Sequence, residues 1–255
     1  MNFFLNACLI FISIIVTGCN TNRSDLPSIQ NFNYLPTSTT GQVVSHNFFT
    51  LSYSEKHEQA EWVAYHLKKN NLKIVVPRLN NFKIDKLITT GSSKLSDYKK
   101  SGYDRGHLAP SRDMSFSRIA SNESFYLSNI SPQDKSFNRG VWKKLESLVR
   151  DWASQYGDVF VITAGVLNSS NLTIGEEQVS VPMFFYKIIL VYDGPNTKTI
   201  AFVMPNEKST KKLSNYVYSV DYVEDLTGID FFPELADNIE DVIEKKSILN
   251  QWSWD

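Results

Sequence analysis

Apolar residues in the body of this chain gather in short runs that are separated by polar turn residues. Residues 159–167, 181–192 and 199–204 are almost continuously apolar, which is typical of strands buried on both faces. The sequence Asp-Gly-Pro-Asn at 193–196 indicates a turn between the last two runs. Residues 48–53 follow a strand-like alternation. These patterns predict a sheet of several strands.

Other segments have the spacing of helices. Within residues 139–156 the large apolar side chains recur every three or four positions, at Trp142, Leu145, Val149 and Trp152. Shorter helices are expected at 220–226, ending at Gly228, and at 238–246. Residues 58–69 fit either a helix or a two-sided strand at 62–67. We expect Trp252 and Trp254 to pack back on the domain.

These elements do not alternate regularly as strand, helix, strand. The mixture predicts an α+β fold around a central antiparallel sheet. Residues 89–102 are expected to form a loop, and a polar loop begins at Pro77-Arg78.

The N-terminal residues 1–19 have the pattern of a targeting segment. The apolar run 3–16 is short for a bilayer span, and Val16-Thr17-Gly18-Cys19 resembles the bacterial lipobox. An exported envelope lipoprotein, facing the periplasm or the outer surface and anchored through a lipid on Cys19, is therefore expected. An ordinary secretory signal, which would give a secreted protein, and an uncleaved anchor are the alternatives. Cys8 and Cys19 are the only cysteines, so the mature body has none to pair.

Residues 20–45 are rich in Asn, Ser, Thr and Pro, which predicts a flexible tether. Residues 46–255 have an ordinary composition without an internal repeat, and we expect a single domain there.

Candidate chemistry is concentrated between residues 103 and 146. Hydrolysis of a phosphodiester needs a base for the attacking water, an electrophile for the phosphoryl oxygens and support for the leaving oxygen. His107 can be the base, because a neutral imidazole has a free lone pair near neutral pH. The amide oxygen of Asn138 suffices for Mg²⁺, which needs only one or two protein oxygens, and Mn²⁺ is an alternative. Arg105 and Arg78 can contact phosphate oxygens in a planar, bidentate manner.

The position of Glu146 depends on where the helix begins. On an ideal helix, Glu146 would lie about 80° around and roughly 12 Å along from Asn138, too far for both side chains to bind one ion easily. Glu146 is therefore expected to hold metal-bound water, unless Asn138 precedes the helix.

Taken singly, these residues have ordinary structural explanations. A histidine is more often a structural residue than a base, and we expect that role for His46, His57 and His66. An asparagine beside Arg-Gly is usually a cap or turn residue. Several elements in a fixed order are a more specific signal than any one of them.

Three motifs carry a resemblance to a known family. They are Asp-Arg-Gly-His at 104–107, Ser-Asn-Ile-Ser-Pro-Gln at 128–133, and Asn-Arg-Gly-x-Trp-x-x-Leu-Glu at 138–146. Together they resemble the DNA/RNA non-specific endonucleases, whose catalytic unit is a ββα-metal motif, over roughly residues 48–235. The resemblance also favours a strand at 62–67.

The resemblance implies a role for each matching residue. His107 corresponds to the general base, Asn138 to the metal ligand and Glu146 to a supporting carboxylate. Arg105 and Arg78 correspond to phosphate-handling arginines with a catalytic part. Positioning and substrate contact are expected at the remaining motif positions, namely Asp104, Asn129 and Arg139. Phe125 departs from the pattern, since some members have asparagine there, and this weakens the case for a larger polar network.

Charge is balanced overall but unevenly distributed. There are 26 basic and 27 acidic residues, a net charge of −1, which is not the composition of a tight polyanion binder. Basic residues surround His107 and Asn138, namely Lys99, Lys100, Arg105, Arg112, Arg118, Lys135, Arg139, Lys143 and Lys144. Acidic residues gather after position 220. A basic cleft on an acidic body would favour transient contacts with phosphates.

The sequence thus predicts a metal-dependent endonuclease that cuts DNA, RNA or both without base specificity, because contacts to phosphate and sugar do not read sequence. Two alternatives remain: a surface lipoprotein that binds nucleic acid without cutting it, and a phosphodiesterase for a non-polymer substrate.

Overall fold

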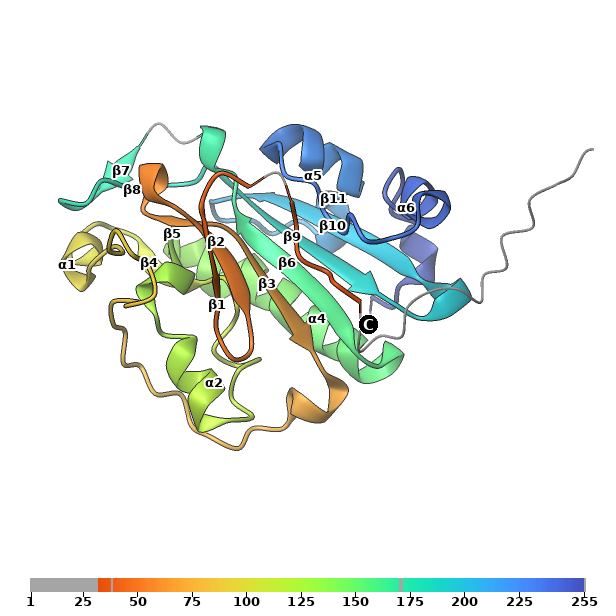
Figure 1. Cartoon of the computed structure of the whole chain (residues 1–255), viewed down its shortest axis with the longest axis horizontal. Helices are drawn as coiled ribbons and strands as arrows, with labels where there is room; N and C mark the ends of the chain where they lie inside the picture. Colours follow the sequence, from red (N-terminus) through yellow and green to blue (C-terminus); the bar gives the residue numbers. More distant parts are fainter. Residues whose placement is uncertain (1–31, 38, 170–171, 255) are drawn as a thin grey trace, which may run out of the picture.

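The computed structural model describes residues 32–37, 39–169 and 172–254. These residues form an α+β fold around a seven-stranded antiparallel sheet with strand order β1-β2-β3-β6-β9-β10-β11 (Figure 1). Its strands are β1 Gln42–Ser45, β2 Thr50–Ser54, β3 Gln59–Leu67, β6 Val159–Gly165, β9 Phe184–Val191, β10 Lys198–Pro205 and β11 Val217–Tyr218. Two small ribbons accompany it, formed by β4 Asp104–His107 with β5 Ile130–Gln133, and by β7 Thr173–Ile174 with β8 Val179–Ser180.

The helices are mostly short. They are α1 Leu95–Tyr98, α2 Arg118–Glu123, α3 Lys135–Phe137, α4 Lys143–Tyr156, α5 Val220–Thr227 and α6 Asp237–Ile243. Single 3₁₀ turns occur at Glu55–His57, Lys69–Leu72, Leu127–Asn129, Leu167–Ser169, Gly194–Asn196, Leu213–Tyr216 and Leu249–Gln251. In the part of the chain that the structure describes, no helix combines the length and apolar character needed to cross a bilayer.

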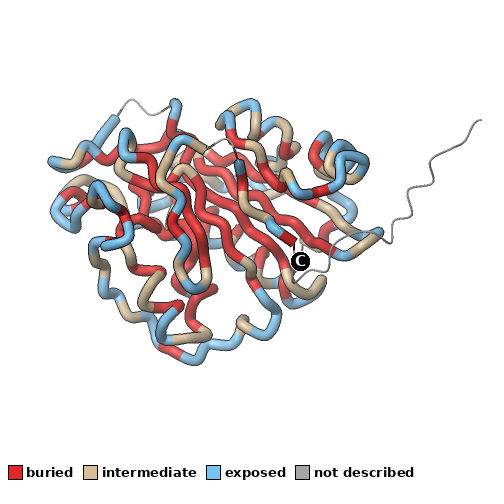
Figure 2. Tube along the Cα trace, viewed as in Figure 1, coloured by how far each residue is buried: buried red, intermediate tan, exposed pale blue. Residues whose placement is uncertain are grey.

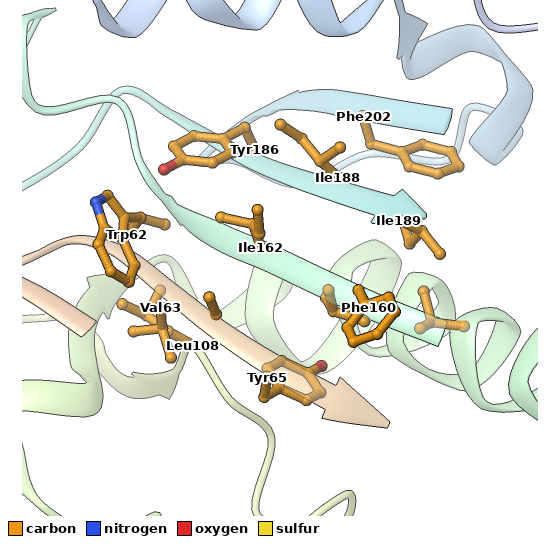
Figure 3. Close-up of a cluster of buried hydrophobic side chains, with 14 of the residues drawn as sticks. Trp62, Val63, Tyr65, Leu108, Phe160, Ile162, Tyr186, Ile188, Ile189 and Phe202 are labelled. Carbon is orange, nitrogen blue, oxygen red and sulfur yellow. The ribbon is translucent and has the colours of Figure 1, made fainter. Parts of the chain in front are cut away.

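The central strands are apolar because both faces of the sheet are covered. Every residue of β6 is buried, and so is nearly all of β9 (Figure 2). A strand buried on both sides reads as a continuous apolar run rather than an alternating one. Figure 3 shows Ile162 of β6 and Ile188 of β9 in this core, with Leu108 next to Val63 of β3. The residue beside His107 is therefore part of the main core.

Helix α4 packs against one face of the sheet, behind it in the view of Figure 1. Its buried side chains have the three-to-four spacing seen in the sequence, and Trp152 stacks on Phe202 of β10 at 6.1 Å between ring centroids. The tail closes over the same region, since the Trp252 ring lies 4.5 Å from Trp152. The predicted helix, the predicted strands and the packing of the tail are confirmed.

The predicted tether is wrong in its second half. Residues 42–45 form β1, which pairs with β2, and the Phe32 ring stacks on Tyr192 at 4.3 Å. The backbone N–H of Thr37 donates to the carbonyl of Asp230 at 2.9 Å. A four-residue edge strand and isolated aromatic anchors create no periodic apolar pattern, so composition alone mistook them for a linker. The rest of the tether and the targeting segment, residues 1–31, lie outside the described residues.

Two predicted boundaries also differ. The loop expected at 89–102 contains the short helix α1, and the helix expected from residue 139 becomes a regular α-helix only at Lys143. Residues Asn138–Trp142 form a wide π-type turn instead. That turn matters for the site.

Candidate active site

The predicted site residues meet at a cleft with a volume of about 1230 Å³. It is lined by Arg78, Arg105, His107, Asn138, Arg139 and Glu146, together with other residues of the 74–82 loop, α1, β4 and the 110–115 segment. Its charged lining is strongly positive, with Arg78, Lys99, Arg105, Arg112, Arg139, Lys143 and Arg150 against Asp104 and Glu146. The basic cleft expected from the sequence is present, although Lys100, Arg118, Lys135 and Lys144 do not line it.

The β4–β5 ribbon fixes the position of His107. Residues 104–107 pair with 130–133 in antiparallel register, so that His107 lies opposite Ile130 and Gly106 opposite Ser131. A Cβ at Gly106 would lie 2.1 Å from the side-chain oxygen of Gln133, which is itself fully buried. Glycine is therefore required here by close packing, and this keeps the neighbouring imidazole at the cleft.

The imidazole of His107 is held in its neutral form. Its residue is only 7% exposed, and the rings of Phe125 and Phe82 lie 4.8 and 5.5 Å from its own. Burial, followed by the charges of Arg78 and Arg105, lowers the pKa of His107 to about 3. Nε2 is buried and makes no hydrogen bond within the described residues. A neutral imidazole is the protonation state that a general base requires.

Phe125 accounts for much of this apolar setting. Its side chain is fully buried, perpendicular to the His107 ring, and the guanidinium carbon of Arg78 lies 5.4 Å from its centroid. The position where some members have asparagine thus provides aromatic packing in this chain rather than a hydrogen bond. In this chain an apolar ring therefore borders His107 at the position where a polar side chain was considered.

Asn138 is oriented by a carboxylate. Its Nδ2 donates to Oδ2 of Asp104 at 2.9 Å, and a carboxylate only accepts, so the amide nitrogen must face Asp104. The amide oxygen is thereby left for another partner in the cleft. Arg139 adds a bidentate contact to Asp104, from Nε at 2.8 Å and from Nη2 at 2.7 Å. These hydrogen bonds outweigh the effect of partial burial and lower the pKa of Asp104, which keeps it ionised.

The π-type turn places Asn138 ahead of the regular helix. Asp134 caps the preceding turn by accepting from the backbone N–H groups of Ser136 and Phe137. Gly140 then departs from helical geometry, at φ −106° and ψ −109°, before α4 begins at Lys143. The ideal-helix estimate for Asn138 and Glu146 therefore does not apply. Both residues line the same cleft.

Glu146 belongs to a buried charged network that sequence reasoning missed. Burial raises the pKa of Glu146 to about 7; Lys187 opposes this shift, and Asp113 adds to it. Asp113 is itself buried, and it accepts from Nη1 of Arg150 at 2.8 Å and from the Tyr65 hydroxyl at 3.1 Å. Burial therefore favours the protonated form of Glu146, and the neighbouring Lys187 favours the ionised form.

Lys187 is the central cation of this network. It is fully buried in β9, its Nζ makes no hydrogen bond within the described residues, and it lies 4.8 Å from the Trp142 ring centroid. Burial lowers its pKa to about 8, against the opposing charges of Glu146 and Asp113. One signal was available in the sequence: Lys187 is the single charged residue in the apolar run 181–192.

The two predicted phosphate-binding arginines lie at the cleft surface. The Arg105 guanidinium lies over the Phe82 ring, 4.4 Å from its centroid, and Nη1 of Arg78 donates to Oγ of Ser111 at 2.7 Å. An arginine has five N–H donors, so each keeps most of them for an anion. Stacking and one hydrogen bond hold the two side chains in place without using up their donors.

The substrate-binding assignment of Asn129 is wrong. Asn129 is completely buried and does not line the cleft. Its side chain accepts from the N–H of Ala109 at 2.9 Å and donates to the carbonyls of Ala109 and Ser124 at 3.0 and 2.9 Å. These hydrogen bonds hold the segment that follows His107, which is the positioning role also expected for Asn129.

The other three histidines have structural partners. His46 Nε2 lies 2.9 Å from Oδ2 of Asp85, His57 Nδ1 lies 2.9 Å from Oγ of Ser180, and His66 lies 3.1 Å from Asp158. None of them lines the cleft. These contacts agree with the structural role expected for the three residues.

Comparison with known proteins gives consistent results. The sequence profile of the DNA/RNA non-specific endonucleases matches residues 30–238. A nuclease from Nostoc sp. is 31% identical over 91% of this chain and 94% of its own length. The human mitochondrial nuclease EXOG is 33% identical over 81% of this chain and 61% of its own length.

A solved structure has the same fold. The protein in the crystal structure of the EndoG/EndoGI complex, described as revealing the mechanism of EndoG inhibition, superposes with a TM-score of 0.73 at 30% identity. The match covers 82% of this chain and 91% of that chain. With a family profile that spans most of its length and relatives above 30% identity, this chain belongs to the DNA/RNA non-specific endonuclease family.

Proposed function

We propose that this nuclease hydrolyses internal phosphodiester bonds of DNA, RNA or both, with His107 as the general base and Asn138 as the protein ligand of one Mg²⁺ ion. The proposal rests mainly on one observation: His107, whose burial favours the neutral imidazole, and Asn138 line the same cleft. The amide nitrogen of Asn138 donates to Asp104, which leaves its amide oxygen for a metal ion. Arginines surround both groups. Base, metal ligand and phosphate contacts therefore face one substrate.

His107 takes the proton of the attacking water. Burial and then the charges of Arg78 and Arg105 lower its pKa in the free protein. A bound phosphodiester offsets the two arginine charges, which are the smaller part of this shift, and so moves the pKa of His107 upward. The base therefore stays neutral without substrate and gains proton affinity when the phosphate binds.

The donor set fits a hard divalent cation. Asn138 offers a neutral amide oxygen, which leaves most of the cation's charge for the phosphate, and Mg²⁺ accepts such a site because it retains several waters. When bound, Mg²⁺ polarises the phosphoryl oxygen and supports the leaving oxygen. Mn²⁺ has similar ligand preferences and is the alternative ion.

Glu146 and the arginines complete the site. In its ionised form, Glu146 accepts hydrogen bonds from water in the cleft. The positive charge of the buried Lys187 favours that ionised form. Arg78 and Arg105 donate to the non-bridging phosphate oxygens, and Arg139 has three N–H donors left beside Asp104. Contacts of this kind go to the backbone of the nucleic acid and do not distinguish bases.

The test is cleavage of supercoiled plasmid and of single-stranded RNA, with Mg²⁺ or with EDTA. Circular plasmid has no ends, so nicking requires internal cleavage. We expect Mg²⁺-dependent cutting that His107→Ala reduces by about 10²–10⁴-fold, the usual contribution of a general base. His57→Ala, which removes a histidine outside the cleft, is the matched control and should cut normally.

The two alternatives give distinct results in the same assay. A nucleic-acid-capture protein would retain plasmid in a gel-shift assay without nicking it under Mg²⁺ or Mn²⁺. A phosphodiesterase for small substrates would hydrolyse a simple aryl phosphodiester while leaving plasmid and RNA intact.

We further propose that the mature protein is held in the cell envelope by a lipid on Cys19, as the apolar run and the lipobox-like sequence at 16–19 suggest. Detergent partitioning of the expressed protein tests this. The native chain should partition with detergent and Cys19→Ser should not. Equal partitioning of the two into the aqueous phase would indicate secretion instead.

A further inference from the structure

A cluster of three carboxylates lies outside the cleft, where α5 meets the end of α6. One carboxylate oxygen from each of Asp221, Glu224 and Glu244 lies within 4.8 Å of the other two. None of the three lines the cleft. Both helices lie beside β10 and β11, at the opposite edge of the sheet from β1 (Figure 1).

Backbone contacts bring the three residues together. Asp221 and Glu224 are three positions apart on α5 and so share a face of that helix. Glu244 directly follows α6, and its carbonyl accepts from the N–H groups of Val220 and Asp221 at 3.0 and 3.4 Å. The last turn of α6 is thereby fastened to the first turn of α5, with the Glu244 side chain directed at the α5 carboxylates.

Glu244 differs from an ordinary surface carboxylate in its burial and its lack of hydrogen-bond partners at one oxygen. The residue is only 4% exposed, and its Oε1 is buried without a hydrogen-bond partner among the described residues. Leaving a carboxylate oxygen buried and unpartnered is costly. The charged groups that act on Glu244 are carboxylates as well, namely Glu224, Glu240, Asp221 and Asp230. By contrast, Asp221 has a simple explanation, because an acidic side chain in the first turn of a helix is favourable.

We propose that Asp221, Glu224 and Glu244 form a binding site for a Ca²⁺ ion that joins α5 to the end of α6. Carboxylate oxygens are the preferred ligands of this hard cation, which binds at Ca–O distances of about 2.3–2.6 Å. Mg²⁺ demands a near-ideal octahedron and usually keeps several waters rather than binding in a cage of protein carboxylates. The flexible coordination of Ca²⁺ tolerates three carboxylates from two separate helices and allows water to fill the remaining positions.

The site would stabilise the C-terminal part of the domain. Glu224 also accepts from the N–H of Phe231 at 2.8 Å, and Phe231 packs on Tyr186 of the central sheet. The adjacent Asp230 accepts from the Thr37 hydroxyl at 2.8 Å. A cation on Glu224 and Glu244 therefore connects α5, α6 and, through the 230–231 loop, the N-terminal segment.

The experiment is thermal unfolding of the full-length protein, freed of metals by chelation, with increasing CaCl₂. Affinities of about 10⁻⁴–10⁻³ M are typical of simple extracellular calcium sites. At a hundred times the dissociation constant, Tm should rise by about 5–10 °C. Asn138→Ala removes the protein ligand of the proposed catalytic metal, so the same measurement in that variant excludes binding in the cleft. We expect its calcium response to be unchanged.

Variants of the cluster complete the test. Glu244→Gln should abolish the calcium response, because it removes one of the three carboxylate ligands. Glu224→Gln serves if Glu244→Gln does not fold. Asp225→Asn, an exposed neighbour on the same helix, is the control and should respond like the native protein. The proposal is overturned if Ca²⁺ up to 10 mM leaves the Tm of Asn138→Ala unchanged, or if both cluster variants keep the full response.

Discussion

Replacing Asp104 with alanine is expected to raise the Mg²⁺ requirement of the nuclease more than it affects the fold. Asp104 accepts from Nδ2 of Asn138, and this contact orients the amide. Without it, the amide can rotate and present its nitrogen to the cation. The buried core does not depend on Asp104, which is half-buried at the cleft.

The magnitude follows from the bonds that are lost. A hydrogen bond to a charged group contributes about 1.5–3 kcal/mol, which corresponds to roughly 10–150-fold in affinity. Removing a group that orients a metal ligand usually costs about 10–100-fold. The ion pair between Asp104 and Arg139 adds little, because the arginine side chain is 69% exposed and solvent screens its charge. We therefore expect the Mg²⁺ concentration for half-maximal rate to rise by about 10–100-fold.

The assay measures initial rates of plasmid nicking across Mg²⁺ concentrations for the native protein, Asp104→Ala and Arg139→Ala. Arg139→Ala keeps the bond between Asp104 and Asn138, so its Mg²⁺ dependence should shift little. High Mg²⁺ should restore much of the rate of Asp104→Ala. An unchanged Mg²⁺ dependence in Asp104→Ala, or a larger shift in Arg139→Ala, would refute the orienting role of this carboxylate.

Three further predictions concern the groups around the cleft. Lys187→Met removes the cation that opposes the raised pKa of Glu146, so the loss of activity toward acid pH should move upward by about one unit or more in a pH–rate profile; an unmoved profile would separate Glu146 from catalysis. The pKa of His107 falls from 6.5 unfolded to about 3 folded, so the folded state binds fewer protons and is destabilised as the pH drops below 6.5. Relative to His107→Asn, the native protein should lose about 2 kcal/mol of unfolding free energy between pH 7 and 5 in urea titrations, and equal losses would contradict the buried neutral state. Gly106→Ala should cost about 1–3 kcal/mol in the same titrations, since its Cβ would collide with the buried Gln133, and a neutral effect would show that this side chain can move.

The sequence predicted the elements whose patterns are local. Strands β6, β9 and β10 are continuous apolar runs, and α4 has a clear apolar stripe, so periodicity finds them. The motif residues His107 and Asn138 were identified as candidates from their order in the chain, and the fold places both at one cleft. Periodicity and motif order can be read from neighbouring residues, which is why the sequence alone reveals these elements and candidates.

What the sequence could not predict depends on distant contacts. Lys187 lies in the buried strand β9, and its electrostatic interaction with Glu146 of α4 forms only when the fold brings these two elements together. The π-type turn at Asn138–Trp142 depends on a departure at Gly140 that no periodic pattern signals. Asn129 stands in a motif, which suggested contact with substrate, yet its three hydrogen bonds bury it beneath the site. Motif position and exposure are separate properties.

The most direct test of the proposed mechanism is a single-turnover cleavage experiment with His107→Gly, with and without imidazole. His107 lies in a small aromatic pocket between Phe82 and Phe125, which free imidazole can enter once the side chain is removed. If His107 is the base, the variant should cut about 10²–10⁴-fold more slowly, and imidazole should restore part of the rate in proportion to its concentration. Asn138→Ala, which lacks the metal ligand instead, should show no such rescue. Cleavage by His107→Gly at the native rate would contradict the assignment of the base.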